Sequence, residues 1–178
     1  MPDNILKNLA LIGFMGSGKT TVGKELARRV GWTFLDSDRL IWEKEKDTIP
    51  EIFEKHGEIY FRRCEHAVLA EVAALEKIVL ATGGGLPIGE QCWEILRRDF
   101  YTVYLKADFD GLFDRIAGDQ FRPLLQKYPT RDRLKELYLS RLGWYERAHV
   151  IIDTTNKKID VIIGEIVERA RIIDSNQR

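Results

Sequence analysis

The chain has 178 residues, a length typical of a single domain, and its 28 Lys plus Arg balance its 28 Asp plus Glu. A formal net charge of zero argues against overall attraction to nucleic acid or to an anionic membrane surface. We find no signal-peptide pattern and no run near the ~18 apolar residues of a membrane span. Cys64, Cys92 and the three histidines lack metal-ligand spacing. We therefore expect one cytoplasmic domain over residues 1–178, with free thiols.

Short apolar runs alternate with amphipathic stretches along the chain. The runs predict strands at Leu9–Ile12, Thr33–Leu35, Ile78–Ala81, Thr102–Leu105 and Val150–Ile152. The amphipathic stretches predict helices at Lys19–Val30, Glu58–Leu75, Leu134–Arg147 and Lys158–Ile172. Each run is nearly all apolar, which is typical of strands covered on both faces. The alternation predicts βαβ units, a mostly parallel sheet and an α/β fold.

The first strand leads into GFMGSGKT, residues 13–20, which fits the phosphate-loop pattern G-x-x-x-x-G-K-[ST] without a mismatch. Its context, a strand before the glycines and a helix after them, is the one that the pattern requires. The glycines allow backbone N–H groups to face a ligand, and the helix N-terminus favours negative charge. Lys19 is expected to reach the β- and γ-phosphates, and the Thr20 hydroxyl to ligate Mg²⁺. The loop therefore predicts binding of a nucleoside triphosphate, most simply ATP.

The second strand ends in FLDSD, which places Asp36 and Asp38 at the edge of the sheet where α/β proteins bind ligands. By themselves these residues could simply cap the following helix. Beside a phosphate loop, one carboxylate can support Mg²⁺ while the other accepts a proton from an attacking hydroxyl.

Three glycines, Gly83 to Gly85, follow the third strand and suggest close approach of the backbone to a ligand, although a flexible turn would look the same. Arg62, Arg122 and Arg141 occur in EIYFRRCE, DQFRPLLQ and LYLSRLGWYERA. A guanidinium group suits a substrate carboxylate or a transferring phosphoryl group. Arg122 falls in an irregular, arginine-rich stretch at about 118–133, where we expect a mobile lid.

Together these segments resemble the shikimate kinase family. The matching segments are GFMGSGKT, DSD, TIPEIFEKHGEIYFRRCE, TGGG, RPLL and IIDTT, in order from about Asn8 to Asp153. The resemblance implies a nucleoside-monophosphate-kinase-like α/β/α P-loop fold with a five-stranded parallel sheet in the order 2-3-1-4-5. It implies ATP-dependent phosphorylation of the 3-hydroxyl of shikimate, on the cytoplasmic route to chorismate and the aromatic amino acids.

The resemblance also implies roles for matching positions. Asp38 would bind the shikimate hydroxyls and accept the proton, and Asp36 would support Mg²⁺. Arg62 and Arg141 would bind the carboxylate, and Gly83, Gly84 and Gly85 would supply backbone donors. Arg122 would reach the transferring group. The nucleotide would be held by the residues Gly16, Ser17, Gly18, Lys19, Thr20, Thr21, Arg115, Arg122 and Asp153.

The chain departs from the family pattern near Arg141. Gly143 replaces a common proline, which we expect to loosen the start of a late helix or shift its cap. Arg147 and His149 stand where acids are common. Lys46 to Thr48 lacks a glycine-containing turn, with little expected effect.

Two other functions remain open from the sequence. One is a gluconate-type kinase of the same fold, which would share the phosphate loop but not the DSD, GEIYFR and TGGG combination. The other is a non-catalytic nucleotide switch, against which Lys19, Thr20, Asp38 and Arg122 all argue. We expect small-molecule substrates, a monomer, and no nucleic-acid or membrane partner.

Overall fold

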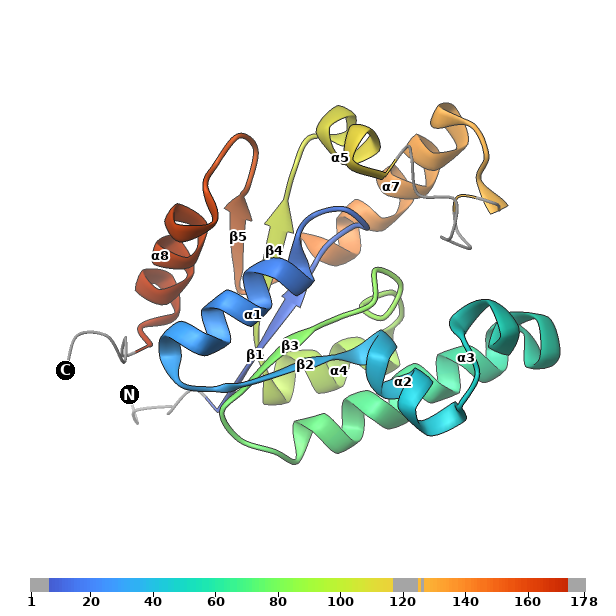
Figure 1. The fold of residues 1–178 in the computed structure, drawn as a ribbon, viewed down its shortest axis with the longest axis horizontal. Coiled ribbons are helices and arrows are strands. Elements are labelled where there is room, and N and C mark those ends of the chain that lie inside the picture. Colours follow the sequence, from blue (N-terminus) through green and yellow to red (C-terminus); the bar gives the residue numbers. More distant parts are fainter. Residues whose placement is uncertain (1–6, 117–124, 126, 173–178) are drawn as a thin grey trace.

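The computed structural model describes residues 7–116, 125 and 127–172 (Figure 1). Its strands are β1 (Asn8–Ile12), β2 (Thr33–Asp36), β3 (Ile78–Ala81), β4 (Tyr101–Lys106) and β5 (Val150–Asp153). Its helices are α1 (Lys19–Val30), α2 (Ser37–Glu45), α3 (Ile49–Ala73), α4 (Glu90–Asp99), α5 (Phe109–Ile116), α7 (Arg131–Tyr145) and α8 (Ile159–Ala170). All five predicted strands and all four predicted helices are present, with bounds shifted by a few residues except at the start of α3.

The five strands form one parallel sheet in the order β2-β3-β1-β4-β5, which confirms the fold expected from the resemblance. β1 lies at the centre, where Leu9 pairs with Val79 on one side and Tyr101 on the other. Because every strand runs the same way, all carboxyl ends meet at one edge of the sheet. The phosphate loop, the DSD segment and the glycine loop (Thr82 to Gly89) all leave from this edge.

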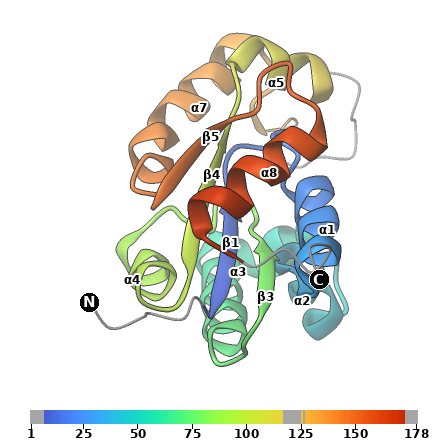
Figure 2. The same ribbon diagram turned by 90° about the vertical axis from the view of Figure 1, so that its left-hand side faces the viewer.

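Helices cover both faces of the sheet and give three layers (Figure 2). Successive residues of β1 point to opposite faces, as in any strand. Leu9 and Leu11 pack in the core formed with α1 and α8, whereas Ala10 and Ile12 pack in the core formed with α3, α4 and α7. The central strands are apolar throughout because both of their faces are buried.

The two edge strands do not follow that expectation. β2 is partly exposed along its length, and β5 alternates buried Val150 and Ile152 with exposed Ile151 and Asp153. An edge strand has a neighbour on one side only, so the helical layers cover it incompletely. The prediction of strands buried on both faces was therefore wrong for these two.

The segment between β2 and β3 contains more helix than the sequence indicated. Lys46 ends α2 in a left-handed conformation (φ 61°), and Thr48 begins α3 with a capping box completed by Glu51. α3 is kinked at Gly57, whose φ of 79° and ψ of 178° lie outside the helical range. These elements bring Arg62 to the sheet edge without a glycine turn at 46–48.

The late helix also differs from the expectation. Gly143 lies in the last turn of α7, which ends at Tyr145, and not at the start of a helix. A Cβ on Gly143 would meet nothing within 4 Å, so glycine is not required there for space. Within the described part of the chain, no helix has the length and apolar character needed to span a membrane. The predicted frayed tail, residues 174–178, lies outside the described residues.

Candidate active site

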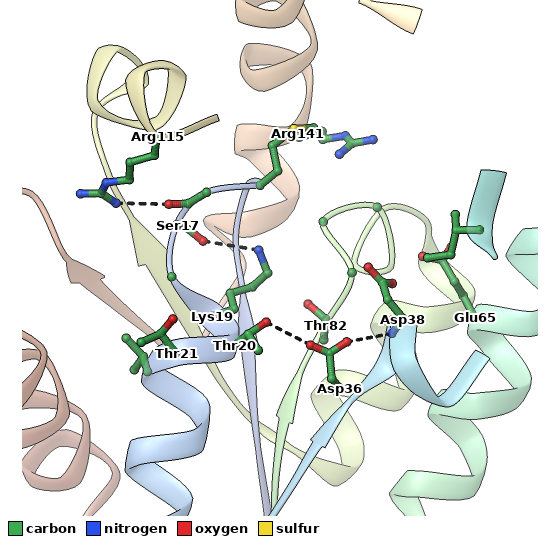
Figure 3. Close-up of a pocket in the computed structure, with 18 of the residues that line it drawn as sticks. Ser17, Lys19, Thr20, Thr21, Asp36, Asp38, Glu65, Thr82, Arg115 and Arg141 are labelled. Atoms are coloured by element: carbon green, nitrogen blue, oxygen red, sulfur yellow. Dashed lines mark hydrogen bonds between the residues drawn. The ribbon is translucent and has the colours of Figure 1, made fainter. Parts of the chain in front are cut away.

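A cavity of about 850 Å³ opens at the carboxyl edge of the sheet, between α1, α2, α3 and α7 (Figure 3). Most residues predicted to act together line it. They are Gly16, Ser17, Gly18, Lys19, Thr20, Thr21, Asp36, Asp38, Arg62, Gly83, Gly84, Gly85, Arg115 and Arg141. The structure thus places the expected nucleotide side and the expected acceptor side in one cavity.

The phosphate loop wraps around the N-terminus of α1. Gly16 (φ 78°) and Gly18 (φ 88°) adopt conformations that other residues rarely take. The Lys19 ammonium group donates to the carbonyl oxygens of Gly13, at 2.9 Å, and Phe14, at 2.8 Å. These contacts hold a positive charge inside the loop, next to the helix N-terminus, where phosphate oxygens are favoured.

Asp36 caps the following helix, which was one of the two alternatives, and its second carboxylate oxygen lies at the phosphate loop. Its Oδ1 caps α2 by accepting from the amides of Asp38, at 3.1 Å, and Arg39, at 3.3 Å. Its Oδ2 accepts from the Thr20 hydroxyl at 3.0 Å. A hydroxyl and a carboxylate oxygen at the phosphate loop are the hard ligands that suit Mg²⁺, so the residues present fit this ion.

The glycine loop lies against three of the predicted site residues. A Cβ on Gly85 would lie 2.6 Å from Arg62 Nη1, and one on Gly83 would overlap Asp38 Oδ1. A Cβ on Gly84 would lie 3.6 Å from Arg141 Nη1. Asp38 and Arg62 therefore occupy the space that a Cβ would need at Gly83 and Gly85, whereas a Cβ on Gly84 would be in ordinary contact with Arg141. The Gly83 amide already donates to the buried Ser37 hydroxyl at 2.8 Å, which leaves the Gly84 and Gly85 amides as the better candidate donors.

Arg62 is held by two acids of α3. It donates to Glu65 at 2.5 Å and to Glu58 at 3.1 Å. Glu65 is 2% exposed, and its burial raises its pKa to about 7, while the Arg62 guanidinium opposes this rise. No role for Glu65 was predicted from the sequence, although this residue ends the GEIYFRRCE segment.

Arg141 is almost entirely buried in α7. Its guanidinium carbon lies 5.9 Å from the centre of the Phe14 ring, which belongs to the phosphate loop. Among the described residues, its Nη1 atom has no hydrogen-bond partner. One turn later, Tyr145 donates from its hydroxyl to the Gly84 carbonyl at 2.7 Å. The charge of Arg141 is thus presented to the cavity beside the glycine loop.

The nucleotide end of the cavity is built from two elements. Arg115 of α5 donates to the Gly16 carbonyl at 3.2 Å. After β5 the cavity is lined by Thr154 and Lys157, whereas the Asp153 carboxylate accepts from the Thr155 amide at 2.9 Å. Asp153 thus shapes the turn, and its neighbours line the cavity.

The predicted lid is described only in part. Arg122 lies outside the described residues, as do 118–124 and 126 of the predicted lid at 118–133. Lys127 and Tyr128 line the cavity, and the Lys127 ammonium lies 3.7 Å from Glu58 of α3. This part of the segment therefore borders the acceptor side.

Two of the residues that depart from the family pattern serve structural contacts. His149 Nδ1 accepts from the Thr102 amide at 3.1 Å, where β4 and β5 begin. Arg147 forms an ion pair with Glu90 of α4. Both thiols, Cys64 and Cys92, are free and half-buried.

Comparison with known proteins points in the same direction as this geometry. Residues 15–171 match the family model described as shikimate kinase. A shikimate kinase of Chromobacterium violaceum is 40% identical over 174 residues, which is 97% of this chain and 94% of that protein. The structure of the Acinetobacter baumannii shikimate kinase in complex with shikimate superposes with a TM-score of 0.89, at 39% identity and 94% coverage of both chains. A gluconokinase of Sinorhizobium meliloti shares only the fold, with a TM-score of 0.59 and 18% identity over 96% of this chain and 95% of that one.

Proposed function

The chain belongs to the shikimate kinase family, and we propose that its cavity transfers the γ-phosphoryl group of ATP to the 3-hydroxyl of shikimate. The product, shikimate 3-phosphate, lies on the route to chorismate and the aromatic amino acids. One observation supports the acceptor most directly. Arg141 is a buried cation whose Nη1 lacks a partner among the described residues, and it faces the cavity beside the glycine loop. A buried charge is costly unless it is paired, so the cavity favours an acceptor that carries a carboxylate.

The carboxylate of shikimate would bind between Arg141 and Arg62. The two guanidinium groups come from α7 and α3 and both lie against the glycine loop. The Gly84 and Gly85 amides would add backbone donors, because the Gly83 amide is used by Ser37. This arrangement fixes one end of the acceptor and leaves its hydroxyls to face Asp38.

Asp38 would bind the shikimate hydroxyls and accept the proton from the 3-hydroxyl as its oxygen attacks the γ-phosphorus. It lines the cavity at the start of α2, across from Lys19 (Figure 3). The bond from the γ-phosphorus to the bridging oxygen breaks as the new bond forms, and ADP leaves. The placement of Asp38 against Gly83 fixes the direction of its carboxylate.

The phosphates would be neutralised by the phosphate loop. Lys19 lies within the loop and would exchange its contacts with Gly13 and Phe14 for phosphate oxygens. Arg115 and Thr21 would border the nucleotide, and Thr154 and Lys157 would line its far end. Arg122 would complete the site when the lid closes and excludes water.

Thr20 and Asp36 are the residues that would hold Mg²⁺. The ion, when bound, offsets the charge that builds up on the phosphate oxygens. Asp36 also caps α2, so the same carboxylate connects the cation site to the helix that carries Asp38. We further propose that the enzyme is a monomer acting in the cytoplasm.

The acceptor assignment is tested by ADP release. Purified protein with Mg·ATP would be given shikimate, gluconate or no acceptor, and ADP would be measured by a coupled assay. We expect release that depends on shikimate and stays at the background rate with gluconate. Release with gluconate alone would assign the sugar-acid kinase reaction. ATP binding without any acceptor-dependent release would point to a non-catalytic nucleotide protein.

A further inference from the structure

Arg147, two residues beyond the end of α7, contacts two tryptophan rings. Its guanidinium carbon is 5.1 Å from the ring centre of Trp93 in α4 and 4.9 Å from that of Trp144. The same group donates twice to Glu90, at 2.9 and 3.0 Å to its two carboxylate oxygens. A planar guanidinium group can stack and form a two-point ion pair at the same time, which a lysine cannot do.

These contacts join the two elements that frame the glycine loop. Glu90 is the first residue of α4, directly after the loop, and Trp93 lies one turn further on and is almost fully buried. On the other side, α7 carries Arg141 and ends at Tyr145, whose hydroxyl binds the Gly84 carbonyl. The middle of the glycine loop is thus bonded to α7 through Tyr145. The residue that follows the loop, Glu90, is bonded to Arg147 just beyond α7.

We propose that Arg147 is a positioning residue, which fixes the glycine loop relative to Arg141 and so sets the affinity for the acceptor carboxylate. This inference rests on the proposed function, because it assumes that Arg141 and the loop amides bind that carboxylate. Arg147 itself is not in the cavity and acts only through α4 and α7.

A glycine close to Arg147 explains why the end of α7 would need these contacts. Gly143 lies in the last turn of α7, and a glycine there allows more backbone freedom than most residues. Arg141 lies two residues before Gly143 in the same part of the helix, so the position of this last turn sets the position of the guanidinium group. The cation–π contacts of Arg147 with Trp93 and Trp144 restrain the chain just beyond that glycine.

The first test compares steady-state kinetics of Arg147→Gln with those of Arg98→Gln. Arg98 is a matched control, because it forms a similar exposed pair with Asp99 at the other end of α4. We expect Arg147→Gln to raise KM for shikimate about three- to tenfold, with KM for ATP and kcat within about twofold of wild type. Arg98→Gln should leave all three near wild type. A loss of thermal stability with an unchanged KM for shikimate would overturn the proposal.

The aromatic partner offers a second comparison. Trp144→Phe keeps a ring beneath the guanidinium group and should retain most of the affinity, whereas Trp144→Leu should raise KM for shikimate as Arg147→Gln does. Equal behaviour of the two Trp144 variants would contradict a role for stacking.

Hydrogen exchange of the amides in residues 82–89 gives a readout that does not depend on the substrate. We expect faster exchange in this segment for Arg147→Gln than for Arg98→Gln. If exchange is faster in Arg147→Gln but the wild-type protein shows no shikimate-dependent ADP release, the restraint of the glycine loop by Arg147 is supported and the proposed function is wrong. Unchanged exchange would overturn the restraint.

Discussion

The Arg62 guanidinium group occupies the position that a side chain on Gly85 would need, because a Cβ on Gly85 would lie 2.6 Å from Arg62 Nη1. Gly85 does not have a positive φ, so the backbone itself would accept another residue. The constraint comes from the side chain of a different element, α3. This relationship explains why a glycine-rich loop is needed on the acceptor side, where no phosphate is expected.

Gly85→Ala should therefore displace the Arg62 guanidinium group and weaken carboxylate binding. We expect KM for shikimate to rise about tenfold or more and KM for ATP to stay near wild type, since Arg62 is a flexible side chain that can move without unfolding the protein. Gly164→Ala is the matched control, because it also adds a methyl group but has open space around it in α8. Steady-state kinetics with each substrate varied would check this, and equal effects on the two KM values would contradict it.

Asp36→Asn should weaken the response to Mg²⁺ without unfolding α2. Asparagine caps helices as well as aspartate does, so the bonds to the Asp38 and Arg39 amides can be kept. The negative charge beside Thr20 is lost, and we expect the Mg²⁺ concentration for half-maximal activity to rise about three- to tenfold. Asp47→Asn, which changes a partly exposed acid paired with Lys55 and distant from the phosphate loop in the sequence, should leave that concentration unchanged. An unaltered Mg²⁺ dependence in Asp36→Asn would remove Asp36 from the cation site.

Local patterns were sufficient to predict much of this molecule. The phosphate loop can be predicted from sequence because its glycines, Lys19 and Thr20 lie in one short segment flanked by a strand and a helix. The strand positions followed from apolar runs. The sheet order came from the family resemblance, since the runs carry no information about which strand pairs with which.

Residues that act through tertiary contacts were harder to predict. In the sequence, Glu65 is indistinguishable from the other charged residues of an amphipathic helix. It is buried beside Arg62 only because α3 packs against the sheet. Ser37 lies between the two aspartates of DSD, yet its role is to accept from the Gly83 amide 46 residues away. Arg147 contacts Trp93 of α4 and Trp144 of α7. These two helices are far apart in the sequence, so no local sequence pattern predicts that the three side chains meet.

Glu65→Gln should change how stability depends on pH. Burial raises the pKa of Glu65 to about 7 from an ordinary value near 4.5, so between these values the folded state holds a proton that the unfolded state has released. The contribution of Glu65 to stability is therefore greatest below pH 4.5 and falls as the pH rises to about 7. Glutamine has no such contribution, so the variant should gain about 1–3 kcal/mol relative to wild type between pH 5 and pH 8.

Chemical denaturation of both proteins at pH 5, 6, 7 and 8 would measure this difference. Glu43→Gln is a suitable control, since it makes the same substitution at an exposed residue that pairs with Arg39. A constant difference for Glu65→Gln over the same range would mean that Glu65 titrates near its ordinary pKa.

Asp38→Asn should separate catalysis from nucleotide binding. Asparagine matches the size of aspartate and can lie against Gly83 in the same way, but it cannot accept the proton of the attacking hydroxyl. We expect kcat to fall about 10²- to 10³-fold, equivalent to about 2.7–4 kcal/mol of activation free energy. ATP affinity, measured by calorimetry, should stay within about twofold of wild type, because Lys19 and the phosphate loop are untouched. Turnover close to wild type would exclude Asp38 as the proton acceptor and leave it only the binding of the shikimate hydroxyls, whereas loss of ATP binding would show that its charge supports the nucleotide side of the cavity.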